Sequence, residues 1–204
     1  MKLYSFSGSC GLAAHITLGW IGKPFDVNLM KKENLKTPEY LKINPMGKVP
    51  VLDDDGFILS ENGAVLTYLA GKFPEAKLEG DGSLKGKAVV HHWLGLVNSE
   101  IHPAYKPLFG ATAYLGDDKA IEKTKDNAHT QLRHIFEIVN TQLGKSSYIA
   151  GARSIADAYL FVTVMWAGIV KIDLSGLDHV KAFEQRMRAD PAVKAALKGE
   201  GLEK

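Results

Sequence analysis

The first eighty residues alternate between short apolar or aromatic runs and segments with helical spacing of apolar residues. Short runs between turn residues are typical of strands, and apolar residues at every third or fourth position are typical of helices. This half of the chain therefore predicts the order strand, helix, strand, followed by two strands and a helix. We expect strands at 1–6, 25–30, 48–52 and 57–59, helices at 11–21 and 61–73, and a short helix within 31–43.

The rest of the chain shows only helical periodicity, which indicates a change of domain. Residues 79–86 hold three glycines and few apolar side chains, as a linker does. Ser154 and Asp157 form a capping-box motif before an almost wholly apolar run, so the helix that follows should be the buried centre of its domain. We expect a domain at 1–78, a linker at 79–86 and an all-helical domain at 87–204, with helices at 88–109 (bent at Pro103 or Pro107), 119–143, 155–171, 177–189 and 191–198.

Composition narrows the class of protein. The chain has 204 residues, of which 46% are hydrophobic and 24% charged, and this balance excludes a disordered chain. The net charge is only +2 and no dense basic block occurs, so we expect a small ligand, no nucleic acid and no membrane as partner. The amino terminus is too polar for a signal peptide, which predicts a cytoplasmic protein.

Cys10 is the single cysteine, so an internal disulfide and a multi-cysteine metal site are excluded and no metal is expected. It follows a strand and a tight turn at the expected start of a helix, where free backbone N–H groups and the helix dipole stabilise a thiolate. A small buried side chain is the alternative interpretation. Because no second thiol is available, any disulfide chemistry needs a thiol from outside the chain.

Val49-Pro50 lies in an expected strand, where proline occurs at an edge, a bulge or a cis turn. A cis bond would leave the backbone groups of Val49 free to bind an extended peptide, and an ordinary trans edge proline is equally compatible with these residues.

Ser60, Glu61 and Asn62 are three polar residues at the start of the helix expected at 61–73. Ser60 is expected to cap it, and the following backbone N–H groups suit a carboxylate while Glu61 suits an ammonium group. Glu61 near a helix start is also simply a favourable pairing with the helix dipole. His102 could face the junction of the two domains, although an isolated histidine is more often at the surface or in a satisfied core position.

Together these pieces resemble the cytosolic glutathione transferases, and specifically the bacterial beta class, over the whole chain. The resemblance is carried by MKLYSFSGSCGLAAHITL, NPMGKVPVL, SENGAVLTYLA and SIADAYLF with WAGIVKIDLSGLDHVKAF after it, all in the family's order. It implies a thioredoxin-like βαβ-ββα domain joined to an all-helical domain, hence an α/β plus all-α fold. It also implies a homodimer, glutathione as co-substrate at the domain junction, and a small hydrophobic electrophile as second substrate.

The resemblance also implies positions for the parts of glutathione. Val49, before a cis Pro50, should bind the cysteinyl unit through its backbone. Glu61 and the backbone of Asn62 should bind the γ-glutamyl end, and Lys32 should reach the glycine carboxylate.

The thiol side of the implied site is formed by Cys10, which contacts the glutathione sulfur or forms a mixed disulfide with it. Ser99, Glu100 and His102 align with the segment of the helical domain that lines this side, and His102 could assist a proton transfer.

Three functions follow from this assignment. The first is a glutathione transferase that presents the thiolate to a small electrophile, and the second is thiol exchange with mixed disulfides through Cys10. The third is a non-catalytic glutathione-binding protein. It is suggested by Gly95, where the family commonly has asparagine, and by Pro103, where the family usually has lysine.

Overall fold

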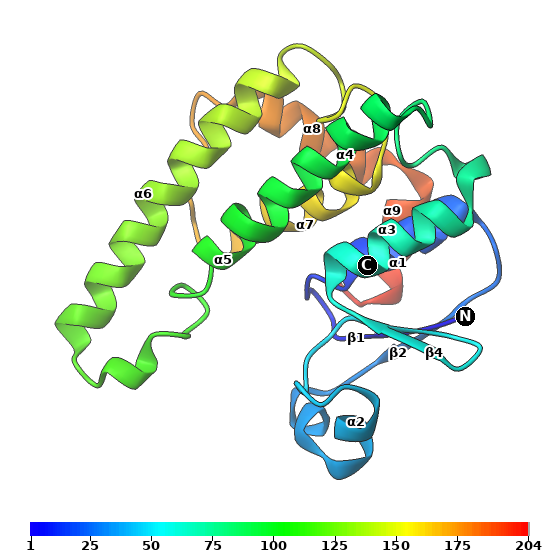
Figure 1. Ribbon diagram of the computed structural model, residues 1–204. Coiled ribbons are helices and arrows are strands. Elements are labelled where there is room, and N and C mark those ends of the chain that lie inside the picture. Colours follow the sequence, from blue (N-terminus) through cyan, green and yellow to red (C-terminus); the bar gives the residue numbers. More distant parts are fainter. Residues whose placement is uncertain (204) are drawn as a thin grey trace.

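The amino-terminal part of the protein is built on one four-stranded sheet. The computed structural model describes residues 1–203 (Figure 1), and its strands are ordered β2-β1-β3-β4. β1 runs parallel to β2, and the pairs β1–β3 and β3–β4 are antiparallel. The strands are β1 (Lys2–Ser5), β2 (Asp26–Leu29), β3 (Val51–Asp54) and β4 (Phe57–Ser60).

Helices cover both faces of this sheet. Figure 1 shows α1 (Leu12–Ile21) and α3 (Asn62–Lys72) on one side and α2 (Pro38–Ile43) on the other. A parallel pair of strands needs a crossover, and α1 supplies it between β1 and β2. Every residue of α1 from Leu12 to Leu18 is buried, because this helix also packs on α7 and α9 of the helical part. The prediction of a βαβ-ββα domain is confirmed.

The rest of the described chain is helical, as predicted. Its longest helix, α6, extends away from the sheet domain in Figure 1. α7 is buried from Ile155 to Ala167, and the predicted capping box is present at its start, where Asp157 accepts from the Ser154 N–H at 2.9 Å. The helices are α4 (Leu84–Leu96), α5 (His102–Ala104), α6 (Asp118–Leu143), α7 (Ile155–Ile169), α8 (Asp178–Ala189) and α9 (Pro191–Gly199).

The segment expected to be a linker is partly helical. α4 begins at Leu84, inside residues 79–86, because Ser83 caps it by accepting from the Gly86 N–H at 3.0 Å. Glu79 is also anchored, through His91 at 2.8 Å and Lys87 at 3.1 Å. The first part of this segment is therefore tied to α4 through Glu79. The extent of the linker, 79–86, stays a prediction.

The single bent helix expected at 88–109 is instead divided into three helical segments, the last of which ends at Ala104. α4 continues into a π-helical segment, Val97–Ile101, and then into the short α5. Pro103 has no N–H to donate to the preceding turn, and the N–H of His102 reaches back five residues to the Val97 carbonyl. His102 thus stands at the junction of two kinds of helix.

The expectation that Ser60 caps α3 is wrong. Ser60 is the last residue of β4, and Glu61 occupies the position before α3 with a φ of +69°. The chain turns sharply between the strand and the helix, and this turn requires the left-handed conformation at Glu61.

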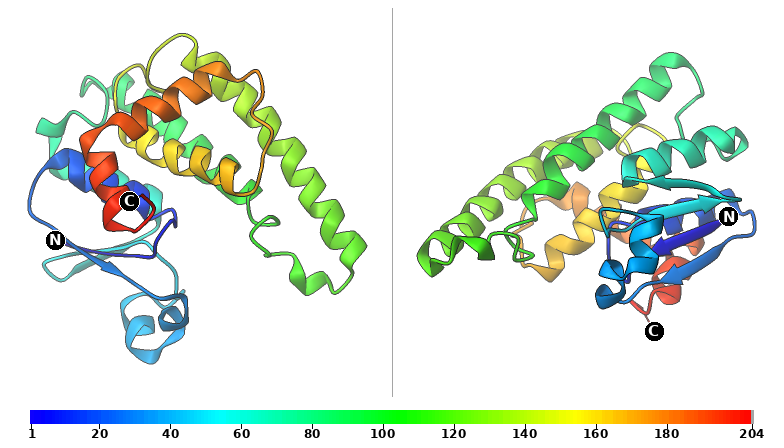
Figure 2. Two further views of the ribbon diagram at one scale, coloured as in Figure 1. Left: turned by 180° about the vertical axis from the view of Figure 1, so that it is seen from behind. Right: turned by 60° about the horizontal axis from the view of Figure 1, so that its bottom comes forward.

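The carboxyl-terminal segment returns to the sheet domain. Figure 2 shows α9 beside α1 in the view from behind, and the two helices are in contact. Among residues 1–203, no helix combines the length and apolarity that crossing a membrane requires.

Candidate functional site

Cys10 lies beside the Val49–Pro50 peptide, which is cis as the resemblance implied. The Cys10 thiol donates to the Val49 carbonyl oxygen, with sulfur and oxygen 3.8 Å apart. The turn before α1 and the loop before β3 therefore meet at one place.

The turn that carries Cys10 is fixed by hydrogen bonds to Trp166 and Glu200, which both lie in the helical part of the chain. The Gly8 N–H donates to the Glu200 carboxylate at 2.9 Å, and Trp166 Nε1–H donates to the Gly8 carbonyl at 2.8 Å. Ser7 Oγ donates to the Glu200 carbonyl at 2.6 Å, and His15 Nδ1 lies 3.2 Å from the same carboxylate. His15 is buried, so this contact belongs to the interior of the protein.

The surroundings of Cys10 favour the neutral thiol over the thiolate. Although its side chain is partly exposed, the surrounding protein desolvates the sulfur and raises its pKa to about 12. The N–H groups of Cys10 and Gly11 lower the pKa, and the nearby charge of Glu61 raises it. The N–H groups of the helix start do favour a thiolate, as the sequence predicts, and burial opposes it more strongly; the role of Cys10 as a reactive thiol stays a prediction.

His102 is paired with a residue that the sequence did not single out. Its Nδ1 atom lies 2.5 Å from the Tyr159 hydroxyl, and its ring meets the Trp166 ring edge-on with centroids 5.0 Å apart. Burial lowers the pKa of His102 to about 4, helped by the positive charges of Lys106 and Lys48. The imidazole is therefore neutral near pH 7 and can accept a proton or a hydrogen bond.

The start of α3 lies in the same region. Glu61 is exposed and acts electrostatically on both Cys10 and Tyr159, so the three are close in space. Asn62 is 4% exposed. Asn98, in the π-helical segment, places its Oδ1 atom 3.7 Å from the point where a Cβ on Gly63 would stand. The helical part thus reaches the start of α3 through Asn98, one turn after Gly95.

Other predicted site residues lie apart from this group. Lys32 is exposed at the start of a 3₁₀ segment, Lys32–Lys36. Ser99 and Glu100 line a hollow of about 290 Å³ that is shared with α6. Their contacts with glutathione stay predictions.

Five residues of the site were missed by the sequence reasoning: Lys48, Lys106, Tyr159, Trp166 and Glu200. A signal existed for two of them, since Tyr159 and Trp166 carry polar groups within the apolar helix α7, and buried hydroxyl and indole groups normally require partners. Lys48 and Glu200 act on residues that are distant in sequence, His102 and Gly8, whereas the charge of Lys106 acts on His102 from four residues away. In the described part of the chain, no group of three or more His, Cys, Asp or Glu side chains is arranged to hold a metal ion.

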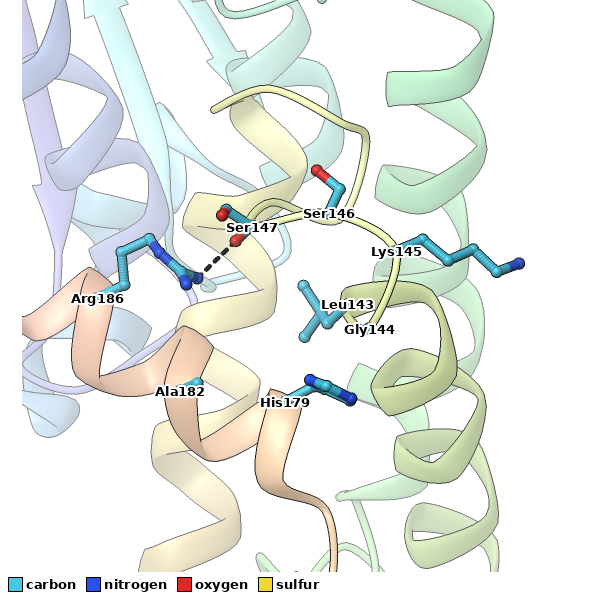
Figure 3. Close-up of a pocket in the computed structure, with 8 residues that line it drawn as sticks. All are labelled: Leu143, Gly144, Lys145, Ser146, Ser147, His179, Ala182 and Arg186. Atoms are coloured by element: carbon cyan, nitrogen blue, oxygen red, sulfur yellow. Dashed lines mark hydrogen bonds between the residues drawn. The ribbon is translucent and has the colours of Figure 1, made fainter.

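A second hollow lies between the end of α6 and α8 and is separate from Cys10 (Figure 3). It has a volume of about 270 Å³. Arg186 donates to the carbonyl of Ser147, which also lines the hollow, at 2.7 Å, and Lys145 points away from the hollow in Figure 3. This hollow shares no residue with the site at Cys10.

Two family models match the chain. "Glutathione S-transferase, N-terminal domain" matches residues 1–71, and "Glutathione S-transferase, C-terminal domain" matches residues 98–191. Glutathione S-transferase GST-4.5 of Xanthomonas campestris is 44% identical over 203 residues, which is 99% of this chain and 100% of that relative.

Solved structures agree with these matches. A glutathione S-transferase from Xylella fastidiosa superposes with a TM-score of 0.97 at 45% identity, covering 99% of both chains. A sphingomonad glutathione S-transferase complexed with glutathione has a TM-score of 0.88 at 35% identity, covering both chains fully. A bacterial beta class enzyme from Sphingomonas chungbukensis has a TM-score of 0.87 at 35% identity over the same full length.

Proposed function

Because the chain belongs to the glutathione S-transferase family and its structure resembles the beta class, we propose that it conjugates the thiol of glutathione to small apolar electrophiles. One observation carries this proposal. The Cys10 thiol, the cis Val49–Pro50 peptide and the start of α3 meet beside a neutral His102. The sphingomonad relative, which is complexed with glutathione, supports this tripeptide as co-substrate.

Each part of glutathione has a suitable protein group in this proposal. The backbone of Val49 binds the cysteinyl unit by strand addition, since the pairing of β3 with its neighbours begins only at Val51. Glu61 takes the γ-glutamyl ammonium group, and the backbone N–H of Asn62 takes its carboxylate. Lys32 is assigned to the glycine carboxylate, and Ser99 and Glu100 to the helical side of the site.

Cys10 acts in this scheme as a donor. A thiol with a pKa of about 12 keeps its proton near pH 7, so Cys10 can donate a hydrogen bond to the glutathione sulfur anion. The N–H groups of Cys10 and Gly11 at the start of α1 favour the same charge. Glutathione releases its thiol proton to water on binding; the thiolate then forms a bond to the electrophilic carbon, and the leaving group departs with its electron pair.

An aromatic wall beside His102 supports an apolar electrophile. Phe109 stacks on Tyr105 with centroids 5.8 Å apart and meets the edge of Trp166 at 5.3 Å. Tyr105 and Trp166 are buried, whereas Phe109 is 51% exposed. The wall therefore offers its outer ring to a small apolar molecule, such as an aryl halide.

Thiol exchange is the second candidate, and the position of Cys10 at the site favours it. The Cys10 thiolate would attack the glutathione sulfur of a mixed disulfide and expel the other thiol. A second glutathione thiolate would then attack the Cys10–glutathione disulfide, which yields oxidised glutathione and frees Cys10. This route requires Cys10 to lose its proton, and burial opposes that step. A non-catalytic glutathione-binding protein is the remaining alternative.

A second copy of the chain is part of the proposal. β4 exposes Phe57 and Ile58, and α4 exposes Leu84 and Val89, so a partner has apolar surface to cover. A homodimer at micromolar concentration is expected in solution, and a monomeric mass would contradict it. The cytoplasm is the expected compartment, since a single free cysteine suits reducing conditions.

One experiment tests the activity. Glutathione-dependent conjugation of an aryl halide and reduction of a small mixed disulfide are measured with the wild type and Cys10→Ala. We expect conjugation to persist in Cys10→Ala at a reduced rate, while disulfide reduction is lost. Binding of glutathione by the wild type without either activity would favour the non-catalytic alternative and contradict the transferase proposal.

A further inference from the structure

The carbonyl oxygen of Lys48 accepts two hydrogen bonds from α2 and the residue that follows it. The Tyr40 hydroxyl donates to this oxygen at 2.8 Å, and Asn44 Nδ2 donates to it at 2.8 Å. Both donors are buried, since Tyr40 is 2% and Asn44 5% exposed. Lys48 directly precedes the Val49–Pro50 peptide, so two buried side chains hold the backbone at the entrance to that peptide.

α2 is itself fixed to the sheet through Tyr40. The Tyr40 ring lies beside the ring of Tyr4 in β1, with centroids 6.2 Å apart. Burial raises the pKa of Tyr40 to about 12, so its hydroxyl keeps its proton near pH 7 and remains a donor. The position of the Lys48 carbonyl is therefore set relative to the sheet as well as to α2.

The 3₁₀ segment before α2 is joined to the same loop. Lys36 Nζ donates to the Met46 carbonyl at 3.1 Å. Gly47 has a φ of +58°, and a Cβ at this position would stand 2.5 Å from the Leu35 carbonyl oxygen. So close an approach requires glycine. The 3₁₀ segment, α2 and the loop between α2 and β3 therefore form one connected unit.

We infer that Tyr40 and Asn44 are positioning residues for glutathione. The connected unit, residues 32–48, is called the α2 unit below. It begins at Lys32, which is proposed for the glycine carboxylate, and it ends beside Val49, which is proposed for the cysteinyl unit. The two buried hydrogen bonds set the spacing of these two contacts before the tripeptide binds, which lowers the cost of ordering the site. This inference rests on the proposed function.

Two ligands distinguish positioning from general support of the fold. Glutathione spans both proposed contacts, whereas γ-glutamylcysteine lacks the glycine and uses only the contact at Val49. A looser spacing between the contacts therefore weakens the binding of glutathione more than that of γ-glutamylcysteine. A purely structural role would lower the thermal midpoint and leave the ratio of the two dissociation constants unchanged, so this ratio is the readout.

Tyr40→Phe removes one donor and keeps the ring beside Tyr4, and Asn44→Ala removes the other donor. Each variant should weaken glutathione binding about fivefold, which is what one hydrogen bond contributes, and γ-glutamylcysteine binding by less than about twofold. Gly47→Ala should act in the same direction, because its Cβ pushes the 3₁₀ segment away from the loop. Isothermal titration calorimetry measures both dissociation constants.

Gln142→Leu and Gly116→Ala are the matched controls in the helical part. Gln142 Nε2 donates to the Ile149 carbonyl at 3.1 Å, so its substitution also removes a side-chain donor to a backbone carbonyl. Gly116 has a φ of +64°, and a Cβ there would meet nothing within 4 Å, so alanine adds backbone strain without the close contact found at Gly47. Both controls should lower the thermal midpoint and leave the ratio of dissociation constants unchanged.

Deuterium exchange of the ligand-free protein tests the α2 unit without glutathione. Tyr40→Phe should speed amide exchange in the 3₁₀ segment and in the loop before Val49 together, because both are held through α2. Faster exchange confined to the loop would overturn the inference, since the two contacts would then not be coupled.

An unchanged ratio of dissociation constants in both Tyr40→Phe and Asn44→Ala would also overturn the inference, and it would leave the proposed function intact. Lys32→Ala tests the assignment on which the inference depends, and it should weaken the binding of glutathione alone. Equal affinities of Lys32→Ala and the wild type for glutathione would refute that assignment and the inference with it. A wild type that binds neither ligand would refute the proposed function itself.

Discussion

The side-chain carboxylate of Glu200 accepts a hydrogen bond from the backbone N–H of Gly8, two residues before Cys10. The Glu200 side chain is fully buried, and its other oxygen lies 3.2 Å from His15 Nδ1. The segment after α9 therefore fixes the turn that positions the thiol. The two parts of the chain are joined at the site itself, and not only through the helix contacts of α1.

Glu200→Ala should destabilise the protein by about 3 kcal/mol, because it leaves the Gly8 N–H and the His15 ring without their buried partner. Activity at saturating glutathione should also fall, since the turn before Cys10 loses its anchor. Urea unfolding measures the first effect, and steady-state kinetics with an aryl halide measure the second.

Glu203→Ala is the matched control in the same segment. Glu203 pairs with Arg188 at 2.7 Å in a partly exposed position, so its removal should cost less than about 1 kcal/mol. Equal costs for the two variants would show that the segment acts as a whole and that the Glu200 carboxylate has no special role.

Local patterns predicted most of the fold. The buried helix α7 was visible as an apolar run behind the Ser154–Asp157 capping box, and both features are present. The expected ends of elements were less accurate where a cap or a turn decided them. α4 starts at Leu84 because Ser83 caps it, and this local signal falls inside the segment expected to be a linker. Ser60 stays in β4 because the turn places its left-handed residue at Glu61, and a residue pattern does not encode that backbone geometry.

The candidate site was predictable only where it lies in short motifs. Cys10, the cis bond at Pro50 and Glu61 each have a local signal. The Tyr159 hydroxyl beside His102 and the Glu200 carboxylate beside Gly8 join residues 57 and 192 positions apart. The burial that raises the pKa of Cys10 also depends on surroundings that are distant in sequence, so a local pattern could not decide between the two interpretations of this residue.

Substitution by alanine should lower the stability of the protein at Gly11 and raise it at Gly95. A Cβ on Gly11 would clash with the Ser5 hydroxyl, whose residue is fully buried, so Gly11→Ala should cost about 1–3 kcal/mol. A Cβ on Gly95 would meet nothing within 4 Å, so Gly95→Ala within α4 should add about 0.5–1 kcal/mol of stability. Urea unfolding of both variants measures the difference, and a loss of stability in Gly95→Ala would contradict this account.

His102 should stay neutral down to acidic pH. Its pKa of about 4 in the folded protein lies below the ordinary 6.5, so the unfolded chain binds a proton first as the pH falls. Its contribution to stability is complete above about pH 6.5 and is lost as the pH falls toward 4. Titration of the histidine ring signals by NMR, assigned with His102→Gln, checks the value. A midpoint near 6.5 would refute the burial argument.

Phe109→Ala should impair the use of apolar electrophiles. The exposed outer ring of the aromatic wall is removed, so KM for an aryl halide should rise several-fold while glutathione affinity stays within about twofold. Tyr114→Ala is the control, since Tyr114 is 83% exposed and no ring contact joins it to Trp166. Equal effects in the two variants would remove Phe109 from the electrophile site.

Cys10 should react slowly with iodoacetamide near pH 7, with a rate that still rises between pH 8 and 10, because only the thiolate reacts and its pKa is about 12. The charge of Glu61 contributes to this high pKa, so Glu61→Gln should lower the pKa and speed alkylation at a fixed pH. Glu33→Gln, which removes an exposed charge of the same sign, is the control and should leave the rate unchanged. A rate that levels off below pH 8 in the wild type would mean that Cys10 is a thiolate without glutathione. Thiol exchange would then become the stronger assignment, since the nucleophile would already be formed.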